Sequence, residues 1–364
     1  MDYKDDHRQS EVVEAMRPLL IVLVLFIHTL PEIRIPVEIQ FSSMGLYRIL
    51  SEMISHNLGG IAVPCFFLIS GFFFFYKYEK KWNFKFYLIQ LKKRSRTLLI
   101  PYLIWNLLFI LAIVMKNYVF RFFALENDDF LLTVQTHSWF ELLWSIPINF
   151  PLWYLRDLIC MVVLSPLFFF FFRYTKISGL LLLMGAYLFG WRINMPGFST
   201  TAFFFFGSGA FLALNKKNIL FVCARFRYPI ALAALFFLCC ATYYNGTAYH
   251  GYILRVFVPF GVITAVNMTN RIVCYEKWRK ILHSLSVTVF FIYAIHIIYI
   301  MNWLKGGFYK TVLVHDGWGM ILGYLLIPCI CLGVCISLYF ILSKVCPRLL
   351  AVLTGNRISY YNNK

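Results

Sequence analysis

The sequence predicts an all-α polytopic membrane protein, a single domain over residues 1–364 that crosses the bilayer about ten times. First, 61% of the residues are hydrophobic and 20% are aromatic, far more than the core of a soluble domain of this length requires. Second, apolar runs long enough to cross a hydrocarbon layer of about 30 Å recur along the whole chain. Third, the loops between them are short, so no segment has the composition of a soluble domain.

The expected membrane helices follow from these runs. In order, they are residues 16–31, 56–76, 97–115, 152–172, 177–193, 199–214, 228–244, 250–266, 285–303 and 318–343. The first run is not a cleaved signal peptide, because HTLPEIRIP follows it without a small-residue cleavage pattern. We expect residues 1–10 to form a flexible cytoplasmic segment and residues 344–364 a cytoplasmic tail.

Individual helices carry further signals. Glycines in the second and sixth runs, at Gly71, Gly207 and Gly209, predict close helix contacts, since small residues let membrane helices approach. The third run begins directly after a basic stretch, and the fourth opens with WYLRDL. Several runs are short or interrupted by polar residues. Such irregularity is tolerated in lipid only where neighbouring protein or water satisfies the backbone, so these helices are expected inside the bundle.

Basic residues fix the expected orientation. If the N-terminus is cytoplasmic, 25 of the 34 Lys and Arg residues fall in inner segments. The positive-inside rule therefore predicts that both termini are cytoplasmic. We expect a multi-pass protein of the cell inner (plasma) membrane. A net charge of +18 is accounted for by anionic membrane lipid, so nucleic acid is not an expected partner.

One basic stretch carries more positive charge than the membrane topology requires. The stretch KKWNFKFYLIQLKKRSRTLLIP, which begins at residue 80, crowds positive charge at the inner start of the third helix. This group has two interpretations: it anchors the chain to lipid headgroups, or it cradles the phosphates of an anionic cytoplasmic ligand.

The first helix carries a titratable ring into lipid. Arg17 and His28 are eleven residues apart, which makes three turns plus about 20°, so they share a face and lie about 16 Å apart along the axis. An intramembrane histidine is expensive and is therefore interpreted as functional rather than as a packing hydrogen bond. Tyr293 and His296, three residues apart in the ninth helix, predict a second polar patch that faces the bundle.

Other polar residues could contact a substrate. These are Ser70 in the second helix and Trp153, Arg156 and Asp157 at the outer end of the fourth. Because Arg156 and Asp157 are adjacent, a helix cap or a structural ion pair is the alternative for them.

Five motifs in order resemble the acyltransferase family 3 proteins, from about residue 11 to about 343. They are Arg17 with His28, then PCFFLISGF at 64–72, KKRSRTLLIPYLIW at 92–105, PLWYLRDLICMVVLSPL at 151–167 and FFIYAIHI at 290–297. Within the family, IPYLIW and PLWYLRDL look most like the branch that puts acetyl or succinyl groups on bacterial surface glycans or their lipid-linked precursors.

The resemblance implies a cytoplasmic acyl-CoA donor, acetyl-CoA or succinyl-CoA, and an acceptor hydroxyl on a glycan or lipid-linked sugar. Arg17 and His28 match the family's first-helix pair, Arg94 and Arg96 its basic pair, and Tyr293 and His296 its late Tyr and His. Lys93 is expected to help bind the donor, and no metal is expected. His28 is the candidate base for the hydroxyl proton, or a nucleophile that carries the acyl group itself.

A transporter or exporter of glycans or lipid-linked intermediates is the competing function. Transporters usually carry intramembrane carboxylates for ion coupling, whereas Asp157 is the only acidic residue clearly inside an expected span. The sequence also shows no convincing repeat of one half in the other. Both observations favour the enzyme.

Overall fold

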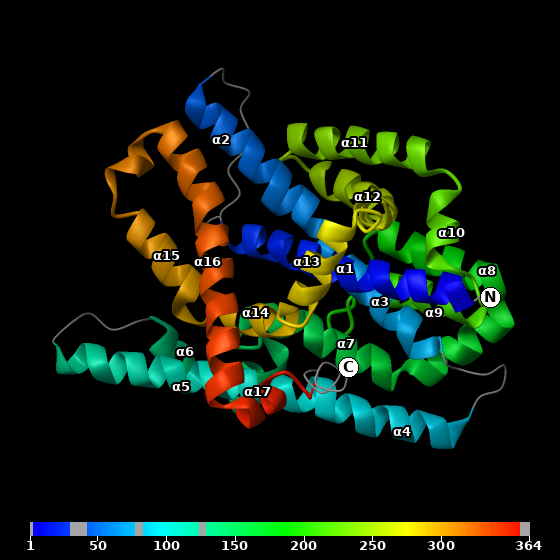
Figure 1. Cartoon of the computed structure of the whole chain (residues 1–364), viewed down its shortest axis with the longest axis horizontal. Coiled ribbons are helices and arrows are strands. Elements are labelled where there is room, and N and C mark those ends of the chain that lie inside the picture. The colour runs from blue at the N-terminus through cyan, green and yellow to red at the C-terminus, as the bar shows by residue number, and fades with distance from the viewer. Residues whose placement is uncertain (1–2, 30–41, 77–82, 124–128, 357–364) are drawn as a thin grey trace.

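The computed structural model describes residues 3–29, 42–76, 83–123 and 129–356, and every regular element within these ranges is a helix (Figure 1). Expected features on residues 30–41, 77–82 and 357–364, which include the first basic residues of the 80–96 stretch and the end of the tail, lie outside the described residues. Seven of the described helical stretches are long and apolar enough to cross a membrane. The predicted all-α polytopic membrane class is confirmed.

Element bounds are as follows. The N-terminal part comprises α1 (Tyr3–Thr29), α2 (Ser43–Ser51), η1 (Glu52–Leu58), η2 (Gly59–Ile61), α3 (Ala62–Phe75), α4 (Phe84–Arg94), η3 (Ser95–Leu99), α5 (Ile100–Phe122), α6 (Asp129–Thr136) and η4 (Glu141–Ser145). The middle comprises η5 (Phe150–Leu152), α7 (Trp153–Val163), α8 (Ser165–Leu188), α9 (Thr200–Leu214), α10 (Ile219–Ala224), α11 (Arg227–Tyr243) and α12 (His250–Ile272). The C-terminal part comprises α13 (Glu276–Ser286), α14 (Val289–Ile295), η6 (His296–Ile300), α15 (Met301–Phe308), η7 (Val312–His315), α16 (Gly317–Val345) and α17 (Pro347–Leu353).

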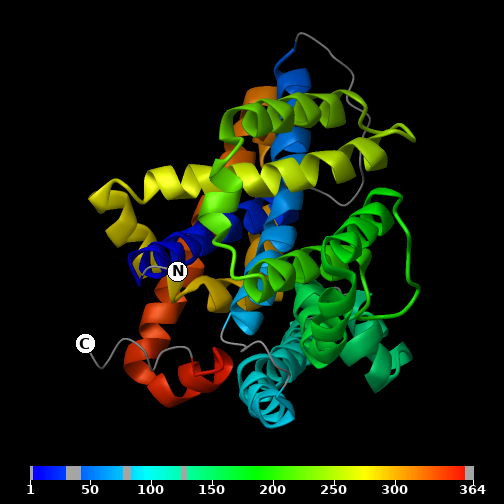
Figure 2. The ribbon, with the colours of Figure 1, turned by 90° about the vertical axis from the view of Figure 1, so that its right-hand side faces the viewer.

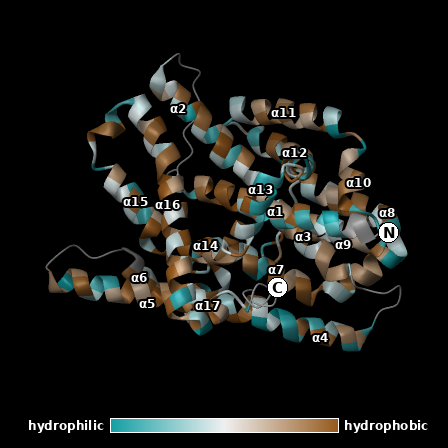
Figure 3. Cartoon of the chain, in the orientation of Figure 1, coloured by the Kyte–Doolittle hydropathy of each residue, from teal (hydrophilic) through white to brown (hydrophobic). Residues whose placement is uncertain are grey.

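The helices surround α1 and cross one another at large angles. In Figure 1, α4 and α5 lie end to end along the picture and α16 crosses them, while Figure 2 shows α11 and α12 side by side. Figure 3 shows hydrophobic residues over most helices and hydrophilic ones along α4 and α13. Large buried side chains from distant segments, including Leu25, Phe72, Tyr102 and Phe291, form one continuous core.

Two expected spans are interrupted. The run at 152–172 ends its first helix at Val163, and α8 begins at Ser165 with Pro166 in its first turn, since proline cannot continue a helix but suits its start. The boundary expected between residues 172 and 177 corresponds to a break at Lys176, whose φ is +51°. In the run at 285–303, Ile298 and Tyr299 leave the helical conformation between α14 and α15.

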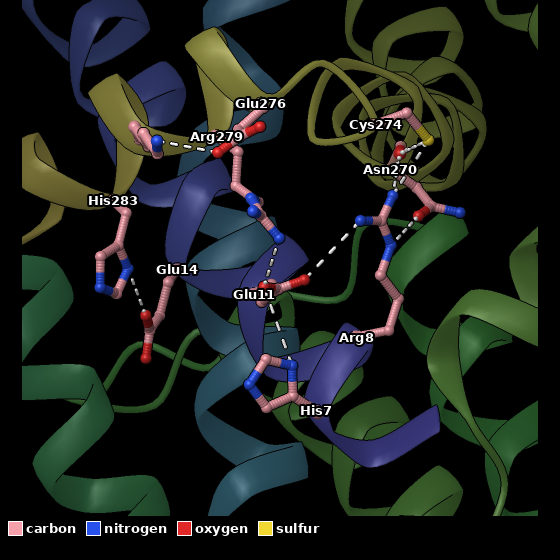
Figure 4. Close-up of polar contacts among 10 residues, drawn as sticks. His7, Arg8, Glu11, Glu14, Asn270, Cys274, Glu276, Arg279 and His283 are labelled. Carbon is pink, nitrogen blue, oxygen red and sulfur yellow. Dashed lines mark hydrogen bonds and ion pairs between the residues drawn. The ribbon is translucent and has the colours of Figure 1, made fainter. Parts of the chain in front are cut away.

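We expected residues 1–10 to be flexible, but α1 already begins at Tyr3. Polar contacts hold this end against the last turn of α12 and against α13 (Figure 4). The Arg8 guanidinium donates to the side-chain and backbone oxygens of Asn270 at 3.1 and 2.7 Å, and Arg279 pairs with Glu11 at 3.2 Å.

Close contact between α3 and α9 depends on glycine, as the sequence predicts. A Cβ atom on Gly71 would lie 2.1 Å from the carbonyl oxygen of Phe206, and one on Gly209 would lie 2.1 Å from that of Leu68. Because both neighbours are backbone atoms, neither can move aside alone. This packing holds α3, which carries part of the cavity wall described below.

We predict that Gly209→Ala lowers stability by about 1–3 kcal/mol, the usual penalty for overpacking a tight contact. The matched control is Gly185→Ala in α8, where a Cβ would meet nothing within 4 Å. Thermal unfolding of the detergent-solubilised protein, followed by size-exclusion chromatography, measures both. An unchanged melting temperature for Gly209→Ala would contradict the glycine-dependent packing.

Candidate active site

A cavity of about 1050 Å³ runs between α1, α3, α4, α7 and the start of α14. It brings together eight residues predicted from the sequence: Arg17, His28, Ser70, Lys93, Arg94, Arg96, Trp153 and Tyr293. Arg17 and His28 lie on the wall of the same cavity, as their helical spacing predicts. The basic residues lie around one part of it, and apolar side chains such as Val63, Phe66 and Leu158 line the rest.

His28 lies at the end of α1, where its ring faces two aromatic neighbours. The edge of Phe150 lies near it, with ring centroids 6.5 Å apart, and the His296 ring is 5.2 Å away, centroid to centroid. The main-chain carbonyl of His28 accepts a hydrogen bond from Lys305 Nζ at 3.1 Å. These contacts hold the last turn of α1, and with it the imidazole, at the cavity wall.

His296 is fully buried behind His28 and does not itself line the cavity. Its Nδ1 lies 3.1 Å from the carbonyl oxygen of Ile292 and 2.9 Å from that of Tyr293. Carbonyls only accept, so Nδ1 carries the proton and Nε2 has a lone pair. Nε2 is buried and has no hydrogen-bond partner among the described residues. An oriented acceptor nitrogen therefore lies beside the candidate base.

The basic end of the cavity contains guanidinium groups for which the described residues supply no hydrogen-bond partner. Arg94 is half-buried, and its Nε is buried without a hydrogen-bond partner in the described part of the chain. Arg17 makes no hydrogen bond or ion pair within 4 Å with a described residue, and the Glu14 carboxylate in the same cavity wall pairs with His283 at 2.9 Å. Arg96 and Lys93 are exposed at the rim. A buried guanidinium is costly unless paired, so this end is suited to an anionic group.

Hydroxyl groups line the middle of the cavity. Tyr293 donates to the carbonyl oxygen of Pro151, so its proton is already committed to the backbone. Ser70 Oγ and Tyr154 Oη lie 3.5 Å apart, and both residues line the cavity. Tyr154 was not selected from the sequence. It adjoins Trp153 in the WYLRDL motif, but composition alone does not mark one tyrosine among the 23 of the chain.

Arg156 and Asp157, predicted to contact substrate, form a structural pair instead of lining the cavity. Arg156 Nε and Nη2 donate to Asp157 Oδ1 at 3.1 and 2.9 Å, and Nη1 donates to the carbonyls of Trp144 and Ser145 at 3.0 and 2.8 Å. Asp157 is 1% exposed. Every guanidinium nitrogen is engaged with protein, so the geometry favours the ion-pair alternative.

A second buried acid pairs with a histidine. Glu52 is 4% exposed within the apolar helical stretch Ser43–Phe75, and its carboxylate lies 2.5 Å from His56 Nδ1. Glu52 lies outside the expected span at 56–76, so the sequence did not single it out as it did Asp157. The sequence places Glu52 before the apolar run that begins near residue 56. The helical stretch already starts at Ser43. His56, one helical turn after Glu52, is the sequence signal that could have indicated this pair.

The arrangement combines an anion site, an apolar passage and a histidine pair in one cavity. An anionic donor could bind at the arginines while its uncharged arm extends along Val63 and Phe66 to the imidazole. This is the chemistry of group transfer from a phosphate-bearing carrier to a nucleophile that has to lose a proton.

Comparisons with known proteins agree with this assignment. The family model described as "Acyltransferase domain" matches residues 11–340. The chain is 26% identical over 374 residues to the succinoglycan biosynthesis protein ExoH of Rhizobium meliloti (strain 1021), a match that covers 97% of this chain and 94% of the relative. No solved structure matches. The family match spans most of the sequence, and the chain therefore belongs to acyltransferase family 3 as a membrane acyltransferase.

Proposed function

We propose that this protein moves an acyl group, acetyl or succinyl, from cytoplasmic acyl-CoA to a hydroxyl of a surface glycan or of its lipid-linked precursor. The observation that carries the proposal is one cavity that joins His28 to arginines with no hydrogen-bond partner among the described residues. Similarity to a succinoglycan biosynthesis protein supports a glycan acceptor. The predicted orientation puts the arginines on the inner side of a bacterial inner membrane, where acyl-CoA is found.

Donor binding uses the basic end. Arg17, Arg94 and Arg96 offer planar guanidinium groups that match phosphate oxygens in pairs, and Lys93 adds a mobile charge at the rim. The pantetheine arm would extend past the apolar wall toward His28. Because the phosphates stay at the arginines, only the acyl end enters the membrane interior.

His28 acts as the general base in this proposal. The acceptor O–H gives its proton to an imidazole nitrogen while the oxygen attacks the thioester carbonyl. The C–S bond then breaks, and the CoA thiolate takes the proton from the imidazolium. His296 is a positioning residue, since its Nε2 lone pair would stabilise the cationic ring during transfer. Acyl transfer through His28 as a nucleophile is the alternative route.

Glycan transport without acyl transfer remains the second candidate function, and the buried Glu52–His56 pair is the observation in its favour. This pair lies outside the cavity wall, whereas the arginines and His28 share it. Group transfer therefore accounts for more of the cavity than passage of a neutral glycan does.

We predict that His28→Ala lowers acyl transfer from radiolabelled acetyl-CoA or succinyl-CoA by about 10²–10⁴-fold, the usual contribution of a general base. Donor affinity should stay near that of the wild type, since the arginines are unchanged. The control is His315→Ala, which changes an exposed histidine that does not line the cavity. Transfer at the wild-type rate by His28→Ala would remove this residue from the mechanism.

We predict that Arg94→Gln weakens acyl-CoA binding by about tenfold to a hundredfold, as expected for a lost charge-assisted hydrogen bond. Lys85→Gln is the matched control, because Lys85 is exposed on the same helix and does not line the cavity. Isothermal titration in lipid nanodiscs measures both variants. Equal losses in the two variants would assign the basic group to lipid instead of the donor.

A further inference from the structure

A second hollow lies between α5 and α15, apart from the cavity of the candidate active site. It encloses about 420 Å³, and the residues used below that line it are Lys116, Tyr299, Asn302, Trp303 and Lys305. We call it the α5–α15 hollow. Lys116 lies roughly 30 Å beyond Arg94 along the continuous helical stretch Phe84–Phe122, a distance close to the thickness of the hydrocarbon layer.

The hollow is connected to the candidate base. Lys305, in its wall, donates from Nζ to the carbonyl oxygen of His28 at 3.1 Å. The η6 segment begins with His296, which lies beside His28, and contributes Tyr299 to the hollow. A ligand held here would lie beside Lys305, one hydrogen bond away from the main chain of His28.

Aromatic rings and a lysine form an organised surface in this hollow. Tyr299 and Trp303 stack with centroids 5.5 Å apart, and Lys116 Nζ lies 4.9 Å from the centroid of the Tyr299 ring. Trp303 is 60% exposed, so one of its faces is accessible. Flat aromatic faces carry partial negative charge and pack against the C–H face of a pyranose ring, while lysines attract anions.

Strain at Tyr299 supports a specific role for this surface. Tyr299 has φ of +60°, a left-handed conformation that is unfavourable for a side chain of this size. It is nevertheless 7% exposed and held between Lys116 and the edge of Phe109. Asn302 makes no hydrogen bond to any described residue, which leaves its amide available to a hydroxyl.

We infer that the α5–α15 hollow binds an anionic sugar unit of the acceptor, with Trp303 under the sugar ring and Lys116 and Lys305 toward its negative charge. This inference rests on the proposed function, because it assigns the acceptor side of the same reaction. The charge could be a carboxylate of the glycan or a phosphate of a lipid-linked precursor. Both present a negative group next to a pyranose ring.

The test is equilibrium binding to the full chain in lipid nanodiscs with three probes. They are an oligosaccharide containing glucuronic acid, a neutral glucose oligosaccharide of equal length, and an isoprenyl phosphate-linked sugar. We expect at least one anionic probe to bind about tenfold or more tightly than the neutral one, with affinity that falls as salt rises. Whichever anionic probe binds identifies the source of the charge.

Variants separate the hollow from a general surface effect. Trp303→Ala and Lys116→Gln should each weaken the anionic probe by about tenfold. Trp318→Ala and Lys310→Gln are matched controls, since Trp318 is 63% exposed, Lys310 is exposed, and neither lines the hollow. Equal binding of neutral and anionic probes, or equal losses in variants and controls, would overturn the inference. The second result would make Trp303 an interfacial anchor only.

His28→Ala distinguishes this inference from the proposed function. It should lose acyl transfer and keep wild-type affinity for the anionic probe. If the wild type binds the probe in a Trp303-dependent manner but never transfers an acyl group, the proposed function is wrong and sugar binding by the hollow is supported. If the wild type transfers acyl groups to a sugar whose affinity does not depend on Trp303 or Lys116, the inference about the hollow is wrong and the proposed function is supported.

Discussion

A polar group buried in a lipid-embedded helix bundle has to find its partner inside the protein, because lipid offers none. Arg156 meets this constraint fully, since its nitrogens donate to Asp157 and two backbone carbonyls. Asn57 meets it through Thr242 and His250. The buried Nε atom of Arg94 and Nε2 of His296 do not, and both lie in or beside the large cavity. These two atoms therefore keep hydrogen-bonding capacity that the described residues do not use.

The break between α14 and α15 is how the chain builds the other side of this site. His296 Nδ1 lies within hydrogen-bond distance of the carbonyls of Ile292 and Tyr293, at the end of the regular helix. That bond fixes the ring, whose centroid lies 5.2 Å from that of His28, and leaves its second nitrogen without a partner among the described residues. Tyr299 in the break and Trp303 after it line the α5–α15 hollow. This interrupted segment therefore supplies His296, which lies beside the candidate base, and also Tyr299 and Trp303 of the proposed acceptor surface.

Sequence reasoning succeeded where one helix determines the outcome. Helical periodicity alone puts Arg17 and His28 on one face, and both line the cavity. It was less successful where two distant segments decide together. Tyr154 Oη lies within 3.5 Å of Ser70 Oγ on another helix, and Arg156 donates to the carbonyl of Trp144. Single-helix periodicity carries no information about such partners.

Helix interruptions were predicted unevenly for a similar reason. Pro166 is a visible signal for the start of α8, but the apolar run around it reads as a continuous span. The break at Ile298 and Tyr299 has no proline or glycine to mark it. Its cause is tertiary, since Lys116 and Phe109 of α5 hold the Tyr299 ring in place. At this point, contacts that form only in the folded chain override the helix propensity of the local sequence.

The separation of charges along the molecule explains how such a site could work across a membrane. In the proposed reaction, the CoA phosphates would be too costly to desolvate in hydrocarbon and would stay at the arginines. The proposed acceptor glycan is equally polar and would stay on the other side. The thioester carbonyl and one hydroxyl are small enough to meet between them, at a ring held at the end of α1 by Lys305. Lys305 lies in the wall of the α5–α15 hollow and donates to the carbonyl of His28, so one side chain links that hollow to the end of α1.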